Sequence, residues 1–468
     1  MNHKAMNYDE FIQGKALQMI PSGIDVNPAD LNPALFPFQR AAVTRALAQG
    51  KFCLGEDTGL GKTIQQLVWC DVIEKHTQRP VFIYAPLAVS HQTAREAAKF
   101  GINCQVASEQ SEVCDRGIYI TNYQKMHRFN VADQSAVCID EASILKNESG
   151  KFANMILDSF RDTPFKLSCS ATFAPNDYTE LGMQSEFVGA MTREEMLAMF
   201  FTHDGGDTSK WRLKNHGQNK FWDWLSSWAV LVRKPSDLGD FDDSTYQLPG
   251  LNVVDHQVET LIAPPDGMLV WIPTGRTDEK RHINKASLED RCHAVAELVN
   301  RSPEQWIVWC NSNAESTLLK KLILESVEVK GSDSDDHKVN SILKFQAGEH
   351  RVIVTKDSIF GFGINLQNCH NMTVFPNDSY ERYYQLIRRC YRFGQQNVVN
   401  VHRIYHQLES YSTIGNVGRK ADESDAMYKA MLPHQIRRMS EKHAQTFRDV
   451  TAYNPKKKMI IPDWLKTA

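Results

Sequence analysis

The sequence has no excess of basic residues and no long apolar run. Lys and Arg number 53 against 56 Asp and Glu, which gives a net charge of −3 over 468 residues. A nucleic-acid partner would therefore need local basic patches, because the chain as a whole is not positive. No apolar run approaches the roughly 20 residues that span a bilayer, and the N-terminal segment Met1–Lys4 starts no signal sequence. We expect a monomeric cytoplasmic protein without a membrane partner.

Paired cysteine motifs are also missing. The ten cysteines are scattered, and none forms a Cys-x-x-Cys pair. Cys53, Cys138, Cys169 and Cys310 lie inside apolar strand-like runs. This pattern is typical of small core residues in a reducing compartment, so we expect no disulfide framework and no cysteine metal site.

A glycine-rich stretch, Gly55–Thr63, stands between the apolar run Phe52–Leu54 and a helical pattern. Strand, glycine loop and helix are the context that a phosphate-binding loop requires. Lys62 can reach the β- and γ-phosphates of a nucleotide, and Thr63 can ligate Mg²⁺. Glu56 occupies the position of the first loop glycine, so an ordinary glycine-rich turn is the alternative. The rest of the chain has to decide between the two.

Two carboxylates end the apolar strand at Ala136–Ile139, as magnesium-nucleotide chemistry needs. Asp140 would hold the metal, and Glu141 would orient or deprotonate the attacking water. Ahead of the loop, the amide of Gln39 can read both edges of an adenine, although a surface glutamine at a helix start is the alternative.

Alternating strands and helices from about 35 to 175 predict a doubly wound α/β domain with a buried parallel sheet. Residues 176–250 break this pattern, and four of the nine tryptophans fall between Trp211 and Trp228. They indicate either a helical core, which we favour, or a nucleic-acid stacking platform.

A second α/β unit follows a segment rich in Asp, Pro and Gly at 234–274. It contains a basic, aromatic helix with Arg388, Arg389 and Arg392, whose guanidiniums suit a phosphoryl-transfer transition state. This unit has no phosphate loop of its own, so its arginines need a nucleotide bound elsewhere.

In this order, the segments resemble the core of superfamily 2 helicases and translocases, most closely the Swi/Snf-like branch, over about 35–405. Asp57–Thr63 resembles motif I, which in this superfamily often lacks the first glycine. Asp140–Ser143 resembles motif II, Gly361–Leu366 motif V and Gln385–Gln395 motif VI. Motif II departs from the branch at Ser143, where histidine is usual, and the short insertions are more like a compact bacterial or bacteriophage member.

The resemblance implies the fold and its boundaries. We expect two RecA-like doubly wound parallel-sheet lobes with a helical insertion and a helical C-terminal tail. The expected boundaries are a lead-in at 1–33, lobe 1 at 34–250 with its insertion at about 176–234, a linker at 251–274, lobe 2 at 275–410 and the tail at 411–468.

The resemblance also implies the site residues. ATP would be bound by Gln39, Asp57, Thr58, Gly59, Leu60, Gly61, Lys62, Thr63 and Gly363. Catalysis is implied for Lys62, Asp140, Glu141, Arg389 and Arg392, and Mg²⁺ binding for Thr63 and Asp140. Contacts to a nucleic-acid backbone are implied for Pro86, Leu87, Thr121, Asn122 and Asn365. Coupling of hydrolysis to motion is implied for Ser170, Ala171, Thr172 and Gln385.

The resemblance implies a DNA-dependent ATPase that moves along DNA by ATP-driven closure of its lobes. Duplex DNA is favoured over single strands as the partner, and the compartment would be the host cytoplasm if the source is a bacteriophage. Two alternatives stay open: a nucleotide-controlled nucleic-acid switch with little turnover, and an RNA helicase of the same superfamily.

Overall fold

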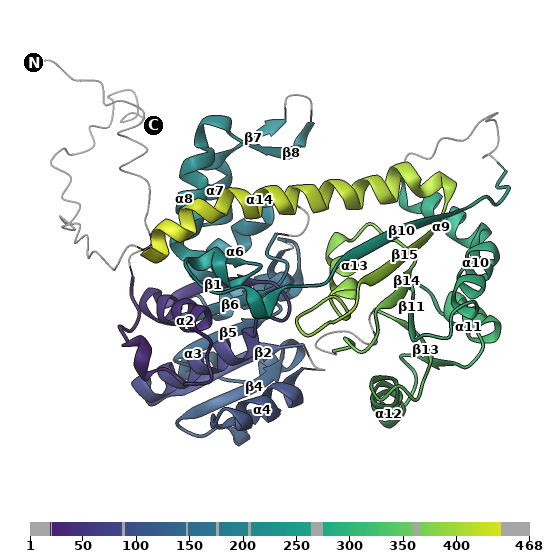
Figure 1. Ribbon diagram of the computed structural model, residues 1–468. Coiled ribbons are helices and arrows are strands. Elements are labelled where there is room, and N and C mark those ends of the chain that lie inside the picture. The colour runs from purple at the N-terminus through teal and green to yellow at the C-terminus, as the bar shows by residue number, and fades with distance from the viewer. Residues whose placement is uncertain are drawn as a thin grey trace, which may run out of the picture.

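The computed structural model describes residues 19, 21–86, 89–146, 148–174, 177–204, 207–263, 275–357, 359 and 365–440. It contains two parallel sheets that form two lobes, with one long helix lying across both (Figure 1). None of the described helices combines the length and apolarity that a membrane span requires. The expected class of two α/β parallel-sheet lobes is confirmed.

Lobe 1 is built on a seven-stranded sheet in the order β3-β4-β2-β5-β6-β1-β9, with parallel pairing throughout. Its strands are β1 (Lys51–Glu56), β2 (Pro80–Ala85), β3 (Cys104–Val106), β4 (Gly117–Asn122), β5 (Ala136–Asp140), β6 (Phe165–Ser170) and β9 (Ala229–Val232). Its helices are α2 (Pro37–Gln49), α3 (Lys62–Thr77), α4 (Ser90–Lys99), α5 (Lys151–Ser159), α6 (Leu181–Val188), α7 (Arg193–Phe200) and α8 (Gln218–Trp228). Alternate residues of a strand belong to different hydrophobic cores. Val81 and Ile83 of β2 lie in one core, and Phe82 and Tyr84 lie in the other. Burial on both faces explains the continuous apolar runs in the sequence.

The tryptophan-rich segment forms part of a lobe 1 core. Trp222, Trp224 and Trp228 are 5%, 7% and 0% exposed and belong to one buried cluster with Phe221. This confirms the helical-core interpretation over a stacking platform. Trp211 is partly buried on the antiparallel hairpin of β7 (Phe201–Asp204) and β8 (Asp207–Leu213).

Lobe 2 is built on a six-stranded parallel sheet in the order β10-β15-β14-β11-β13-β12. Its strands are β10 (Leu251–Val258), β11 (Trp306–Cys310), β12 (Ser326–Val329), β13 (Val352–Lys356), β14 (Asn371–Val374) and β15 (Val399–His406). Its helices are α9 (Thr277–Ala286), α10 (Leu288–Asn300), α11 (Asn313–Leu322), α12 (Asp335–Gln346) and α13 (Tyr380–Ile387).

Strand β10 lies in the segment expected to be a linker. It pairs with β15 over its whole length, from Leu251 opposite Val399 to Val258 opposite His406. Residues 264–274 of the same segment lie outside the described residues. The segment becomes a strand because β15, nearly 150 residues further along the chain, pairs with it along its whole length.

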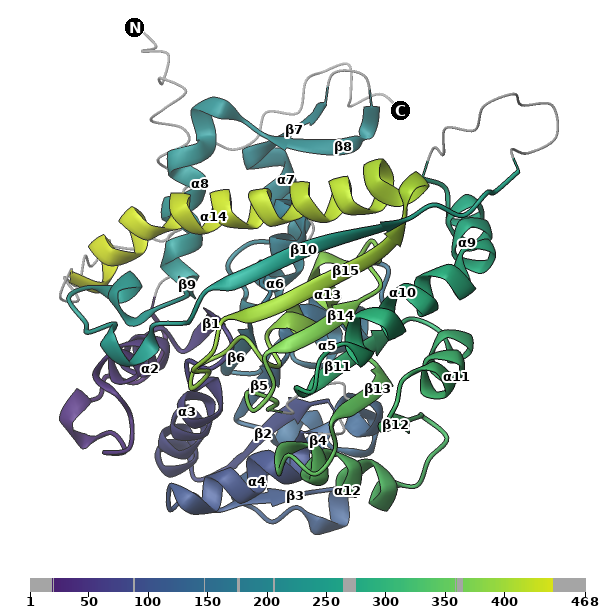
Figure 2. The same cartoon turned by 45° about the vertical axis from the view of Figure 1, so that its right-hand side comes forward.

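The C-terminal helix α14 (Gly415–Ser440) follows lobe 2 in the chain but packs on lobe 1. Figure 2 shows it running beside β10 toward α8. Met427 and Met431 are buried in the same core cluster as Trp228. Residues 441–468 of the expected helical tail lie outside the described residues.

Candidate nucleotide site

The loop between β1 and α3 has the backbone that only glycines allow. Gly59 and Gly61 have φ angles of +90° and +81°. A Cβ on Gly61 would lie 2.3 Å from Nε2 of Gln39, and one on Gly59 would lie 3.1 Å from the backbone nitrogen of Phe393. Positive φ and close neighbours therefore both require glycine at these two positions.

Lys62, the first residue of α3, turns back over the loop. Its Nζ donates hydrogen bonds to the carbonyl oxygens of Glu56 at 2.6 Å and Asp57 at 3.1 Å. Thr63 follows it in the first turn of the helix. A cation and a helix N-terminus at the mouth of a glycine loop form an anion site.

Glu56, which departs from the strict loop pattern, lies beneath the loop. Its side chain is fully buried, and its Oε2 accepts a 2.6 Å hydrogen bond from Nε2 of Gln65 on α3. Burial raises the pKa of Glu56 to about 7, against the opposing charge of Lys62. Position 55 also requires glycine, because a Cβ there would lie 2.5 Å from the Leu231 side chain on β9.

Gln39 braces the loop in this structure. Its Nε2 donates to the carbonyl of Leu60 at 2.7 Å, and its Oε1 accepts from the backbone nitrogen of Phe36 at 2.9 Å. The side chain is buried, so the amide reaches an adenine only if these two bonds are exchanged for bonds to the base.

Asp140 and Glu141 lie at the carboxyl end of β5, the edge of the sheet that also carries the loop. Burial and the neighbouring Glu141 charge raise the pKa of Asp140 to about 7, and the charge of Lys62 opposes them. Glu141 has a φ of +54°, and its buried Oε2 has no hydrogen-bond partner within the described part of the chain. An unpartnered carboxylate oxygen fits a site for a water or a cation.

The donor set fits Mg²⁺ bound together with a nucleotide. Across the described ranges, no group of three or more His, Cys, Asp or Glu side chains forms a preformed metal cage. Mg²⁺ commonly takes only one or two protein carboxylates and fills the rest of its octahedron with phosphate oxygens and waters. Asp140 and Thr63 are suitable ligands of this kind.

Two of the predicted arginines approach lobe 1 from lobe 2. Burial lowers the pKa of Arg389 to about 10, and the charge of Glu141 opposes this shift. Burial also lowers the pKa of Arg392, which the charge of Glu96 on α4 opposes. Both guanidiniums therefore lie within electrostatic reach of lobe 1 carboxylates.

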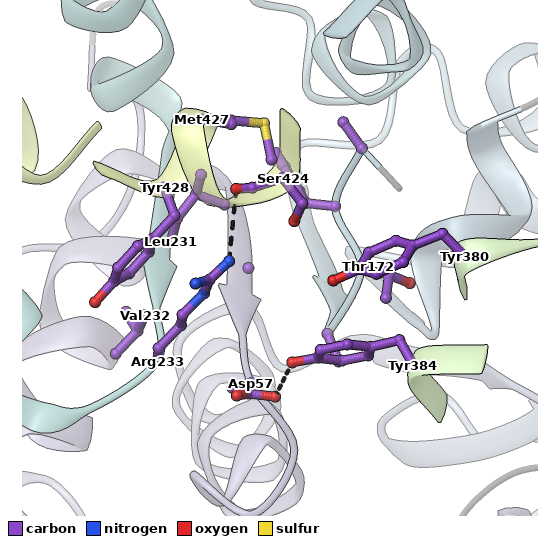
Figure 3. A pocket seen from close by; sticks show the side chains of 14 residues that line it. Asp57, Thr172, Leu231, Val232, Arg233, Tyr380, Tyr384, Ser424, Met427 and Tyr428 are labelled. Carbon is purple, nitrogen blue, oxygen red and sulfur yellow. Dashed lines mark hydrogen bonds between the residues drawn. The ribbon is translucent and has the colours of Figure 1, made fainter. Parts of the chain in front are cut away.

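A third arginine makes a direct contact that the sequence did not indicate. Arg388 forms an ion pair with Asp57 of the loop, and the Tyr384 hydroxyl donates to the same carboxylate. Figure 3 shows the Tyr384 bond beside a pocket of about 50 Å³ that Thr172 and Arg233 also line. The available signal was an acidic residue in the loop and a basic, aromatic helix in the second α/β unit.

The residues expected to couple hydrolysis to motion lie close to this contact. The hydroxyl of Ser170 accepts from the backbone nitrogen of Thr172 at 3.1 Å, and Ala171 and Thr172 line the pocket. Gln385, which follows Tyr384 on α13, has a buried Nε2 for which the described residues supply no hydrogen-bond partner.

The residues expected to contact nucleic acid divide between the two lobes. Pro86 follows β2, while Thr121 and Asn122 end β4, all at the carboxyl edge of the lobe 1 sheet. Asn365 is in lobe 2, where its Oδ1 accepts from the backbone nitrogen of Gln367 at 3.2 Å. Leu87 and Gly363 lie outside the described residues.

Comparisons with known proteins agree with this architecture. Residues 290–394 match the family described as helicase conserved C-terminal domain. The chain is 22% identical over 427 residues to the Bacillus subtilis (strain 168) protein named "Putative ATP-dependent helicase/translocase YwqA", covering 79% of this chain and 45% of the relative. It therefore spans less than half the length of that protein.

Among solved structures, the chain resembles the Sulfolobus solfataricus SWI2/SNF2 ATPase core in complex with dsDNA, with a TM-score of 0.42 and 18% identity over 87% of this chain and 99% of that one. The two parallel-sheet lobes and the helicase domain match make the chain similar to ATP-dependent helicases and translocases.

Proposed function

We propose that the protein is an ATP hydrolase that translocates along DNA, with duplex DNA as the favoured track. One observation carries the proposal: lobe 1 supplies the phosphate loop and two carboxylates, while lobe 2 supplies Arg389 within electrostatic reach of Glu141. A nucleotide held between the lobes is the ligand for which such a divided site is suited. The relative named as an ATP-dependent helicase/translocase supports the same activity.

The residues have separate roles in the proposed reaction. Lys62 and the loop N–H groups bind the phosphates, and Gln39 reads the adenine once its present bonds are exchanged. Glu141 orients the attacking water and accepts its proton as ADP leaves. Arg389 and Arg392 stabilise the charge on the transferred phosphoryl group. Bound through Thr63 and Asp140, Mg²⁺ would neutralise phosphate charge.

Movement is proposed to follow from the same division of the site. ATP favours the state in which both lobes contact it, and loss of the γ-phosphate releases that state. Lobe 1 would hold the nucleic-acid backbone near Pro86, Thr121 and Asn122, and lobe 2 near Asn365. Backbone contacts carry no sequence information, so we expect binding that tolerates any sequence and weakens with salt. The proposed lobes are residues 34–250 and 275–410, with β10 (Leu251–Val258) added to the second because it pairs with β15.

The test is ATP turnover measured without nucleic acid and with duplex DNA, single-stranded DNA or RNA. Strong stimulation by duplex DNA is the expected result. Stimulation by RNA alone would indicate the RNA helicase alternative. Slow turnover that no nucleic acid changes would indicate the nucleotide-controlled switch.

A second assay separates translocation from strand separation. Triplex displacement and unwinding of a forked duplex are measured on the same preparation. We expect displacement of the third strand with little or no unwinding. Efficient unwinding of the fork would contradict duplex translocation.

A further inference from the structure

Asp57 connects the phosphate loop to two other parts of the molecule, strand β9 and lobe 2. Its backbone nitrogen donates to the carbonyl of Val232 on β9 at 2.8 Å. Its Oδ1 accepts from the backbone nitrogen of Thr58 at 2.7 Å, within the loop itself. The same carboxylate receives Tyr384 and Arg388 from lobe 2. One side chain therefore links the loop conformation to the position of lobe 2.

Lobe 2 holds the Arg388 guanidinium in a fixed place. Its Nη1 donates to the carbonyl of Tyr391 at 3.1 Å, and its charge lies 5.2 Å and 5.1 Å from the ring centroids of Tyr384 and Tyr391. The side chains of Arg388 and Asp57 are 10% and 4% exposed. Because both side chains are shielded from solvent and the guanidinium is held by several contacts, this ion pair is sensitive to small displacements of either lobe.

Asp57 is also placed to affect phosphate binding. Its carboxylate engages the N–H of Thr58, one of the groups that line the loop, and its carbonyl accepts from Nζ of Lys62 at 3.1 Å. A rotation of Asp57 would change the direction of that N–H and the anchor of the lysine. Figure 3 shows the carboxylate of Asp57 joined to the Tyr384 hydroxyl by a hydrogen bond.

We infer that Arg388 and Tyr384 are positioning residues that act on the phosphate loop through Asp57. Docking of lobe 2 on this carboxylate holds the loop in its phosphate-binding conformation. Lobe closure and ATP binding thereby favour each other before hydrolysis begins. The inference rests on the proposed ATPase function and assigns Arg388 a role distinct from that of Arg389 and Arg392.

A second ion pair between the lobes offers a matched control. Lys146, after motif II, pairs with Glu381 on α13, about one turn before Tyr384. This pair joins the lobes without touching the loop. If Arg388 only holds the lobes together, loss of either ion pair should have the same effect on the affinity for ATP.

The experiment compares Arg388→Ala, Tyr384→Phe and Asp57→Asn with Lys146→Ala, measuring KM for ATP, kcat and the affinity for a non-hydrolysable ATP analogue. We expect Arg388→Ala to raise KM and the analogue Kd by about tenfold or more, as for loss of a charged hydrogen bond, with a smaller change in kcat. Tyr384→Phe keeps the ring and should shift KM in the same direction. Lys146→Ala should leave KM within about twofold of the wild-type value.

A double-mutant cycle and a rescue complete the design. Asp57→Asn combined with Arg388→Ala should show less than the sum of the two single effects, because each removes the same ion pair. Arg388→Lys keeps the charge and should restore part of the affinity. Thermal unfolding of each variant identifies any that fails to fold, and Tyr384→Phe then serves as the deciding variant.

The results distinguish failure of this inference from failure of the proposed function. Normal KM in both Arg388→Ala and Tyr384→Phe, with turnover intact in the wild-type protein, would overturn the inference and leave the ATPase standing. An equal rise in KM for Lys146→Ala would also overturn the inference. It would show that any ion pair between the lobes supports ATP binding, whether or not it contacts the loop. A wild-type protein without ATP turnover would refute the function itself.

Discussion

Gln435 on the C-terminal helix and Leu231 on the edge strand of lobe 1 exchange two hydrogen bonds. The Gln435 Nε2 donates to the carbonyl of Leu231 at 2.8 Å, and the backbone nitrogen of Leu231 donates to its Oε1 at 3.0 Å. The glutamine is fully buried. Its amide takes the place of the next strand beside β9, so a helix that follows lobe 2 in the chain completes the sheet of lobe 1.

Replacing Gln435 should therefore destabilise lobe 1. Gln435→Ala leaves a buried N–H and a buried C=O of Leu231 without partners, at a cost of about 2–3 kcal/mol. The free energy of unfolding in urea measures this loss. Ile436→Ala, on the exposed side of the same helix, is the control and should change stability little. Equal losses in the two variants would contradict this account of the helix.

Glu141→Gln should trap bound ATP. The change removes the base that accepts the water proton but keeps Asp140 and the loop, so turnover should fall by about 10²-fold or more while binding remains. Lys62→Ala should instead weaken ATP binding, because the cation over the loop is lost. Single-turnover hydrolysis and equilibrium binding separate the two effects. Normal hydrolysis by Glu141→Gln would show that another group activates the water.

Arg389→Ala and Arg392→Ala should abolish most hydrolysis while nucleotide binding largely survives. Removal of an arginine that stabilises the transferred phosphoryl group costs on the order of 10³-fold in rate. The control is Arg382→Ala on α13, whose side chain is 63% exposed and pairs only loosely with Asp357 at 3.5 Å. Undiminished turnover in both test variants would remove these arginines from the mechanism.

Glu56→Gln should stabilise the protein at alkaline pH. Burial raises the pKa of Glu56 from 4.5 to about 7, so the folded protein binds this proton more tightly than the unfolded chain does. The stabilising contribution of the proton is complete below pH 4.5 and is lost as the pH rises through 7. The buried charge then costs about 3 kcal/mol, from the size of the shift.

A glutamine at position 56 still accepts the hydrogen bond from Gln65 but carries no charge. The variant should thus unfold at higher urea concentration than the wild type at pH 8, and the difference should shrink toward pH 5. Urea titrations at several pH values test this. A difference in stability that does not vary with pH would rule out Glu56 as the titrating group.

Trp228→Ala should lower stability without a specific effect on nucleic acid. The ring is 0% exposed in the core of lobe 1, and its loss should cost about 3–5 kcal/mol. Trp211→Ala, which removes a partly buried ring of the β7–β8 hairpin, should cost less. Duplex binding per folded molecule should stay unchanged in Trp228→Ala. A selective loss of duplex binding with normal stability would revive the stacking interpretation.

The local sequence determined the parts of the site that lie next to one another in the chain. The loop from β1 to α3 needs glycines at positions 59 and 61 and a lysine at position 62, all within a few residues, so the pattern alone predicted it. Asp140 and Glu141 follow directly from the end of an apolar strand. The two α/β lobes could also be predicted from the sequence, because buried parallel strands appear there as continuous apolar runs.

Only the tertiary structure decided which distant residues meet. Tyr384 and Asp57 are 327 positions apart, and Gln435 and Leu231 are 204 apart. Which of three neighbouring arginines contacts Asp57 depends on the rotation of α13 and on how lobe 2 docks, and neither leaves a periodic signal in the sequence. The same holds for β10, whose partner β15 comes nearly 150 residues later. Local patterns specify elements, whereas the packing of complete lobes specifies the contacts between them.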